Sequence, residues 1–214
     1  MKKLYFAFFT FFLFITVNSF AQVTVGVTPY TTLGAAFNAI NAGTHTGAIN
    51  ITISGNTTEP VTAVLNSSGT GAANYTSVNI TTSALATVTG NIVGAIIKLN
   101  GADLVTLDGN NLLTISNTST SADAVVVWLA SASTSDGATE NQILNTTIIG
   151  AGTSNGSTST YAGVISSSGT NIRAAADAAN KSNFFGFLKI KSCYIGIGLW
   201  GVPGNEEANT IDTC

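Results

Sequence analysis

Short runs in which apolar residues alternate with polar ones recur along most of the chain. Turn-forming Gly, Asn, Asp and Ser residues separate these runs, so the pattern predicts many short β-strands. The chain is therefore expected to be all-β. The runs cover residues 49–53, 61–65, 78–81, 95–99, 104–107, 112–115, 124–129, 143–149, 163–165, 187–190 and 194–197.

One segment near the start has the spacing of a helix instead. Its apolar residues stand at i, i+3, i+4 and i+7, namely Leu33, Ala36, Phe37 and Ile40. Thr31 or Thr32 is placed to cap this helix, and Gly43 is placed to end it. We expect its narrow apolar stripe to cover the open end of the β-structure that follows.

Two architectures fit so many short strands: a β-solenoid and a β-sandwich. Weak internal repeats favour the solenoid. Residues 189–193 resemble residues 210–214 about 21 positions later, and residues 141–146 resemble residues 209–214 about 68 positions later. Under this alignment, Cys193 and Cys214 would stack on neighbouring coils about 4.8 Å apart.

The first 21 residues have the three parts of a secretory signal peptide. Lys2 and Lys3 precede a short apolar run, and small residues at Ser19 and Ala21 allow cleavage between Ala21 and Gln22. The apolar run is shorter than the roughly 20 residues of a membrane span, which argues against a retained anchor. We therefore expect export, with no membrane span after removal of the signal.

The expected organisation has three parts. Residues 1–21 are the signal peptide, residues 22–47 an N-terminal strand and capping helix, and residues 48–214 the coils of a parallel β-helix. Because residues 209–214 look like the start of a further coil, we expect the chain to be the N-terminal part of a longer protein.

Charge is scarce and limits the function classes. Charged residues make up 8% of the chain, and the net charge is -3. A nucleic-acid surface needs clustered cations, which this composition does not supply, so nucleic acid is not an expected partner. The water-facing groups are mainly hydroxyls and amides. Two cysteines in an exported chain permit a disulfide but do not make a disulfide framework.

The order of these features resembles a known family. A helix at 30–43, a strand at 47–53 and the segment 96–109 follow the signal peptide. Together they resemble the N-terminal region of secreted right-handed parallel β-helix proteins of Bacteroidota, in the pectin-lyase-like superfamily, over most of residues 22–150. The resemblance implies a right-handed parallel β-helix outside the cell, whereas the β-sandwich remains the alternative that the strand pattern leaves open. It implies no single activity, because the fold hosts lyases, hydrolases and adhesins.

Catalytic chemistry is hard to find in this sequence. Glu206, Glu207 and Asp212 form the one concentration of acidic residues and are weak candidates for glycoside hydrolysis. His45 is the single histidine, and a lone histidine cannot build a multi-histidine metal site. Asp108 opens a turn rather than a calcium loop, which needs further oxygen ligands at fixed spacing. We expect no metal or other cofactor.

Two functions therefore remain. The favoured one is a secreted or cell-surface β-helix with a structural or adhesive role and weak binding to glycans or other cell-surface components. The alternative is the N-terminal part of a polysaccharide lyase or glycoside hydrolase whose catalytic coils lie beyond residue 214. Trp128 and Trp200 could stack on sugar rings, although the apolar run around Trp128 favours packing in the core.

Overall fold

A computed structural model describes residues 22–152, 158–202, 204 and 206–214. The predicted signal peptide and Ala21 lie outside the described residues, while Gln22 begins them. The described chain is mostly β-structure with one helix, α1 (Leu33–Asn41). The strands are β1 (Val23–Val25), β2 (Thr28–Tyr30), β3 (Thr46–Ile53), β4 (Thr57–Thr58), β5 (Ala63–Asn66), β6 (Asn74–Thr82), β7 (Ala86–Gly90), β8 (Ala95–Asn100), β9 (Val105–Asn117), β10 (Val125–Ser131), β11 (Gln142–Ile149), β12 (Ala162–Ser168), β13 (Phe184–Gly186), β14 (Lys189–Lys191), β15 (Ile195–Leu199) and β16 (Thr210–Asp212).

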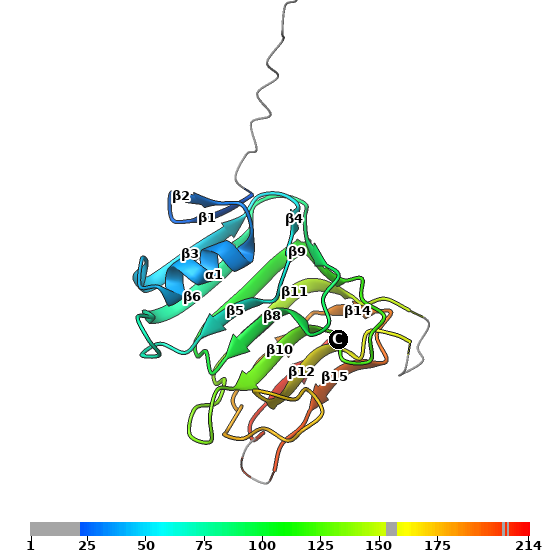
Figure 1. Cartoon of the computed structure of the whole chain (residues 1–214). Coiled ribbons are helices and arrows are strands. Elements are labelled where there is room, and N and C mark those ends of the chain that lie inside the picture. The colour runs from blue at the N-terminus through cyan, green and yellow to red at the C-terminus, as the bar shows by residue number, and fades with distance from the viewer. Residues whose placement is uncertain (1–21, 153–157, 203, 205) are drawn as a thin grey trace, which may run out of the picture.

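The strands form two sheets, and the chain passes repeatedly from one to the other. An 11-stranded sheet has the order β16-β13-β11-β9-β6-β3-β1-β2, with β4, β7 and β14 beside this path, and a 5-stranded sheet has the order β15-β12-β10-β8-β5. Among the described strands, every pairing is parallel except the two that β1 makes. The alternative expectation was a β-sandwich. The sheets of such a sandwich are antiparallel, so the parallel pairing seen here does not fit it. Figure 1 shows α1 beside the blue strands at one end of the sheets and β15 at the other.

Burial alternates along the strands of the larger sheet. In β3, Ile49, Ile51 and Ile53 are buried, while Asn50 and Thr52 between them face outward. Successive side chains of a strand point to opposite faces, so this alternation places one apolar face inside. The main core lies between the sheets and joins residues from β1 to β13 in one cluster.

Two strands of the smaller sheet are covered on both faces. Every residue of β10 and β12 is buried. Val127 and Leu129 face the main core, whereas Trp128 belongs to a second apolar cluster on the outer face together with Ile172. The connection after β12 lies over this face, because its Ile172 packs in the same cluster as Trp128 and its Gly169 carbonyl accepts from Lys98 Nζ at 2.7 Å.

The predicted helix is confirmed in detail. Thr32 is its N-cap, and Thr32 Oγ1 accepts a hydrogen bond from the Ala35 N–H at 3.1 Å. The four apolar residues of the predicted stripe are all buried. Gly43 follows the helix with φ +72°, a left-handed conformation that glycine adopts without steric cost, and its N–H donates to Ile40 O.

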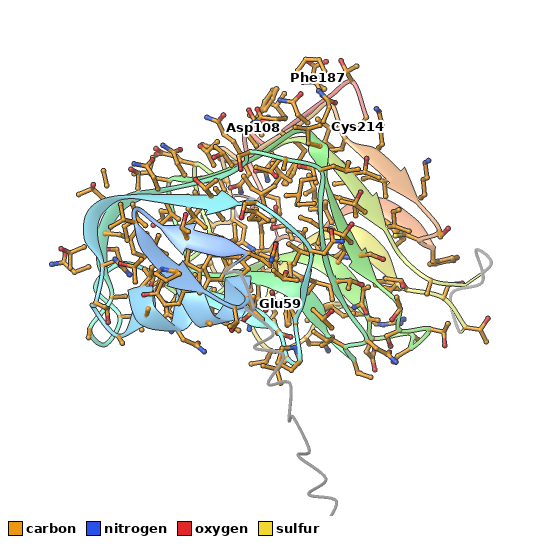
Figure 2. All side chains as sticks on the ribbon, turned by 90° about the horizontal axis from the view of Figure 1, so that it is seen from above. Glu59, Asp108, Phe187 and Cys214 are labelled. Carbon is orange, nitrogen blue, oxygen red and sulfur yellow. The ribbon has the colours of Figure 1, made fainter. Side chains whose placement is uncertain are left out.

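Glu59 attaches the start of this helix to the sheets. Its side chain is 2% exposed; Oε1 accepts from the Leu33 N–H at 2.9 Å, and Oε2 accepts from the Gly34 N–H at 3.0 Å. A Cβ at position 34 would lie 2.9 Å from Glu59 Oε2, so glycine there allows the carboxylate to approach. Figure 2 labels Glu59 near the blue ribbon, well away from Phe187 and Cys214. The sequence analysis did not identify this residue.

Hydrogen bonds to three asparagine side chains join the starts of neighbouring strands in the larger sheet. Asn141 Oδ1 accepts from the Val105 N–H, Asn183 Oδ1 from the Asn141 N–H, and Asn209 Oδ1 from the Asn183 N–H, each at 2.9 Å. The steps between these residues are 42 and 26 positions. The register thus aligns residues 142–144 with residues 210–212 through β13, so two unequal steps make up the 68 positions between these similar segments.

The predicted stacking of the two cysteines is wrong. Ile211 pairs with Phe185, so β16 lies beside β13 and not beside the segment that ends at Cys193. Cys214 Sγ instead lies 3.5 Å from Phe185 O. The Asn183–Asn209 hydrogen bond sets this register, and the local likeness of the two segments around the cysteines does not. Both cysteines are free thiols, and burial raises the pKa of Cys193 to about 11.

Two of the predicted strands are halves of one. The runs at 104–107 and 112–115 both fall in β9, whose first half pairs with β6 and whose second half pairs with β7. The expected turn between them is a bend inside β9, where Asn110 and Asn111 have φ of 49° and 59°. Asp108 Oδ1 accepts from the Asn110 N–H at 2.9 Å, which stabilises the bend.

Candidate functional site

The three acidic candidates do not come together. Glu206 is partly buried, and its Oε1 accepts from Ser166 Oγ at 2.7 Å. Glu207 is exposed, and its carbonyl oxygen accepts from the Ser182 N–H at 3.0 Å. Asp212 lies in β16 and accepts from Thr213 Oγ1 at 2.8 Å. Each carboxylate thus has separate surroundings, and no pair flanks a common cavity.

Glu206 has an altered acidity with a structural cause. Burial raises the pKa of its carboxyl to about 7, against the opposing effect of hydrogen bonds from Ser166, Asn209 and Asn180. Oε2 accepts from Asn209 Nδ2 at 2.9 Å. These contacts tie the segment before β16 to β12, so they give the residue a role in packing.

Metal ligands are equally scattered. Within the described ranges, no group of three or more His, Cys, Asp or Glu side chains is arranged to hold a metal ion. His45 lies partly buried, with Nε2 2.6 Å from Tyr30 Oη, beside a hollow of about 300 Å³ formed by residues 25–26, 44–46 and 48–50. His45 thus lies in the bend between α1 and β3, where the Tyr30 side chain contacts it.

The outward face of the larger sheet carries aligned rows of polar side chains, which we call the polar face. The strand register places Asn50 beside Asn79, Asn79 beside Thr106, and Thr106 beside Gln142. All four are exposed or partly exposed, because their neighbours in each strand point into the core. Further rows of the polar face are Thr52–Thr81–Asp108 on the same strands and, beyond the bend in β9, Thr87–Thr114–Thr147–Lys189.

The spacing of these rows follows from β-geometry. Neighbouring strands lie about 4.8 Å apart, and alternate residues of one strand lie about 6.6 Å apart. The polar face is thus a two-dimensional array of hydroxyl and amide groups, each of which can donate and accept hydrogen bonds. The rows named above contain one acidic residue, Asp108, and one basic residue, Lys189.

A groove of about 550 Å³ lies on the outer side of the smaller sheet. Residues 93–94 and 170–173 line it together with Asp123 and Trp128. The connection before β10 supplies Asp123, and the connection after β12 supplies Arg173. These two segments are 50 residues apart in the sequence. They meet because the connection after β12 runs back over the outer face of the smaller sheet, where Ile172 packs beside Trp128 and Arg173 lies over the Tyr161 ring near the start of β12.

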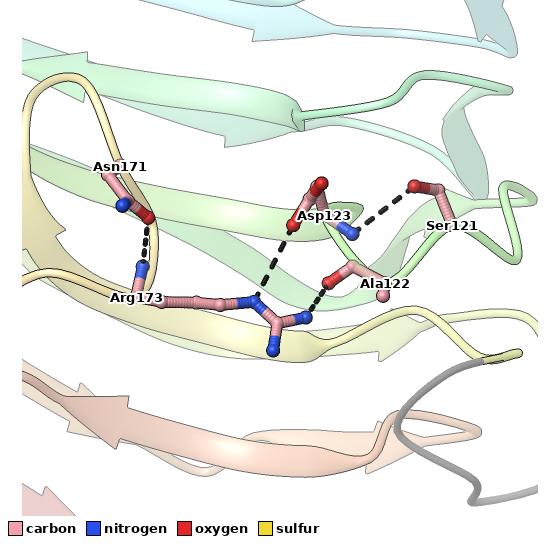
Figure 3. Close-up of polar contacts among 5 residues, drawn as sticks. All are labelled: Ser121, Ala122, Asp123, Asn171 and Arg173. Carbon is pink, nitrogen blue, oxygen red and sulfur yellow. Dashed lines mark hydrogen bonds and ion pairs between the residues drawn. The ribbon is translucent and has the colours of Figure 1, made fainter.

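Arg173 is held from several directions. Its Nε lies 3.5 Å from Asp123 Oδ1, and its Nη2 donates to Ala122 O. Asn171 Oδ1 accepts from the Arg173 N–H at 2.9 Å, as Figure 3 shows. The guanidinium also lies 4.1 Å from the centre of the Tyr161 ring, a cation–π contact.

Trp128 forms the floor of the groove and is itself braced. Lys98 Nζ lies 4.3 Å from the centre of the Trp128 ring and donates to Gly169 O at 2.7 Å. Burial lowers the pKa of Lys98. Trp128 Nε1 donates to Ser167 Oγ at 2.8 Å, so the buried indole has its hydrogen-bond partner. The expectation that Trp128 packs in the core is correct as to burial, although it lies on the outer face.

The pairing of Asp123 with Arg173 could not be predicted from the sequence, because no local pattern connects positions 50 residues apart.

Comparisons with known proteins leave the family open. The chain matches no protein-family model, and it has significant similarity to no curated protein and to no solved structure. In the part of the chain that the structure describes, no helix has the length and hydrophobicity that crossing a membrane requires.

Proposed function

We propose that this protein is a secreted or cell-surface right-handed parallel β-helix that contacts glycans through its polar face and catalyses no reaction on them. The alternation of strands between two parallel sheets supports the β-helix, as does the row of Asn141, Asn183 and Asn209. The position of α1 at one end supports its role as a cap.

The polar face is the observation that carries the proposal. Its hydroxyl and amide rows lie in register over β3, β6, β9 and β11, so they offer repeated donors and acceptors at a fixed spacing. A glycan chain is itself a repeated array of hydroxyls, and it can match such a surface along its length. Contacts of this kind are individually weak, and repetition along the face adds to them.

Binding to insoluble polysaccharide tests the proposal. The purified protein is incubated with cellulose or xylan, and the fraction that sediments is measured. Replacing Thr114 and Thr147 with glutamate places two charges in one row of the polar face, so we expect a clear loss of binding. Thr134→Glu, in an exposed turn, is the matched control and should bind as the wild type does.

Two results would contradict the proposal. Equal binding by the Thr114/Thr147 double variant and by the Thr134→Glu control would show that the polar face is not the contact surface. If the protein releases new reducing ends or unsaturated products from a polysaccharide, and Glu206→Gln abolishes this release, the alternative of a lyase or hydrolase is favoured. Fractionation of the native host provides the separate test of location, with the protein expected in the extracellular or surface fraction.

A further inference from the structure

We propose that the groove beside Arg173 binds one sugar unit of a neutral glycan, with the Arg173–Asp123 pair contacting two adjacent hydroxyls. This inference rests on the proposed function, since it adds a specific subsite to a glycan-contacting protein. It concerns the smaller sheet, so it stands on different residues from the polar face.

The Arg173–Asp123 ion pair supplies the polar groups of the groove. The side chains of Arg173 and Asp123 are 42% and 70% exposed. Arg173 uses Nε and Nη2 for Asp123 and Ala122, and among the described residues none accepts from Nη1. Asp123 uses Oδ1 for Arg173, which leaves Oδ2 as an acceptor. The pair therefore presents donors beside acceptors, the combination that two adjacent hydroxyls require.

Both members of the pair are fixed before any ligand arrives. Arg173 is held by Ala122 O, by the Tyr161 ring and through its backbone by Asn171. The Asp123 N–H donates to Ser121 Oγ at 3.2 Å, which fixes the backbone that carries the carboxylate, as Figure 3 shows, and the carboxylate itself is held by Arg173 Nε. A side chain that is already ordered loses less conformational entropy on binding, so this arrangement favours affinity.

The groove also has an apolar wall. Val93 is 69% exposed, and it lines the groove together with Ile172 and the accessible edge of Trp128. The ring C–H groups of a sugar are apolar and pack against such a wall while its hydroxyls face polar groups. The volume of about 550 Å³ falls in the range of roughly 300–1,000 Å³ that is usual for small-ligand sites.

The charges select a neutral ligand. Arg173 is paired with Asp123, and Lys98 is engaged with Gly169 O and the Trp128 ring. Arg173 is the one cation among the described residues that line the groove, and its charge is balanced by Asp123, so no lining cation is left to neutralise the carboxylate of an acidic sugar. A glycan with carboxylates therefore binds more weakly here than a neutral one.

NMR titration of the purified ¹⁵N-labelled protein tests this inference. The chain has two tryptophans, so the Trp128 indole signal reports on the groove while Trp200 serves as an internal control. The neutral probes are cellohexaose and mannohexaose, whose adjacent hydroxyls differ in orientation, and the acidic probe is hexagalacturonate. We expect at least one neutral probe to shift Trp128 saturably, without shifting Trp200, and to shift it equally in low and high salt.

Variants test the two polar residues. Arg173→Gln and Asp123→Asn should each weaken the binding of the neutral probe about tenfold or more, because each removes a charge-assisted hydrogen bond. Lys181→Gln removes the same charge as Arg173→Gln at another exposed position and should leave affinity unchanged. Asp123→Asn alters an exposed side chain, so it tests the site even if Arg173→Gln disturbs the fold.

Three results would overturn the inference. Salt-sensitive binding of hexagalacturonate without a neutral ligand would show that the ligand class is wrong. An unchanged Trp128 signal with every probe, or unchanged affinity in both variants, would show that the groove is not the site. If the protein sediments with polysaccharide while Trp128 stays silent, the groove fails and the proposed function survives. If no glycan binds in either assay, both fail.

Discussion

Replacing Glu59 with alanine removes the carboxylate that receives the first N–H groups of α1. Glu59 is buried and accepts from Leu33 N–H at 2.9 Å and from Gly34 N–H at 3.0 Å, so alanine leaves both donors without partners. The first N–H groups of a helix have no partner within the helix. They also carry the positive end of its dipole, which a carboxylate complements.

The expected loss follows from these two hydrogen bonds. A hydrogen bond to a charged group contributes about 1.5–3 kcal/mol, and part of that gain is offset by the cost of burying the carboxylate. We therefore expect Glu59→Ala to lower the free energy of unfolding by about 3 kcal/mol. Domains of this size are stabilised by about 5–15 kcal/mol, so the loss is a large fraction of the total. Glu59→Gln keeps one acceptor oxygen and should lose about 2 kcal/mol.

Urea unfolding, followed by circular dichroism, measures the change. Glu207→Gln is the matched control, because Glu207 is exposed and its hydrogen bond comes from its backbone carbonyl. That variant should stay within about 0.5 kcal/mol of the wild type. A loss below about 1 kcal/mol in Glu59→Ala, or an equal loss in Glu207→Gln, would refute the reasoning. The capping role of the buried carboxylate would then be wrong.

Three further predictions concern packing, pH and processing. Asn183→Ala leaves the Asn141 N–H without its partner, so the free energy of unfolding measured by urea titration should fall by about 3 kcal/mol. An unchanged urea midpoint would show that the row of asparagines does not stabilise the fold. The pKa of Glu206 is raised from its ordinary 4.5 to about 7 in the folded protein. Between these two pH values the folded state binds a proton that the unfolded state has lost, so the free energy of unfolding falls as the pH rises through that window. We expect the free energy of unfolding to fall by on the order of 2 kcal/mol across this window, after allowance for the partial exposure of the side chain. Thermal unfolding at a series of pH values measures this dependence, and Glu206→Gln should abolish it. Mass spectrometry of the exported protein should find Gln22 at the N-terminus, and an exported form that retains Ala21 would contradict the signal peptide.

The sequence by itself determined most of the local structure. Alternation of apolar and polar residues located most strands, because a half-buried strand needs one apolar face. The helix was predicted with its N-cap at Thr31 or Thr32, and Thr32 is the cap, since capping and apolar spacing are short-range properties. The strand β13 was missed because Phe184–Gly186 is too short to show an alternating pattern.

Only the tertiary structure decided which distant residues meet. The likeness between the segments around Cys193 and Cys214 suggested one register, but the Asn183–Asn209 hydrogen bond sets another. The same holds for Glu59 beneath α1 and for the pair of Arg173 with Asp123. Insertions of different length separate successive turns, so spacing along the chain does not reveal which residues are neighbours. The register follows from buried hydrogen bonds and packing between strands, and these exist only once the sheets have formed.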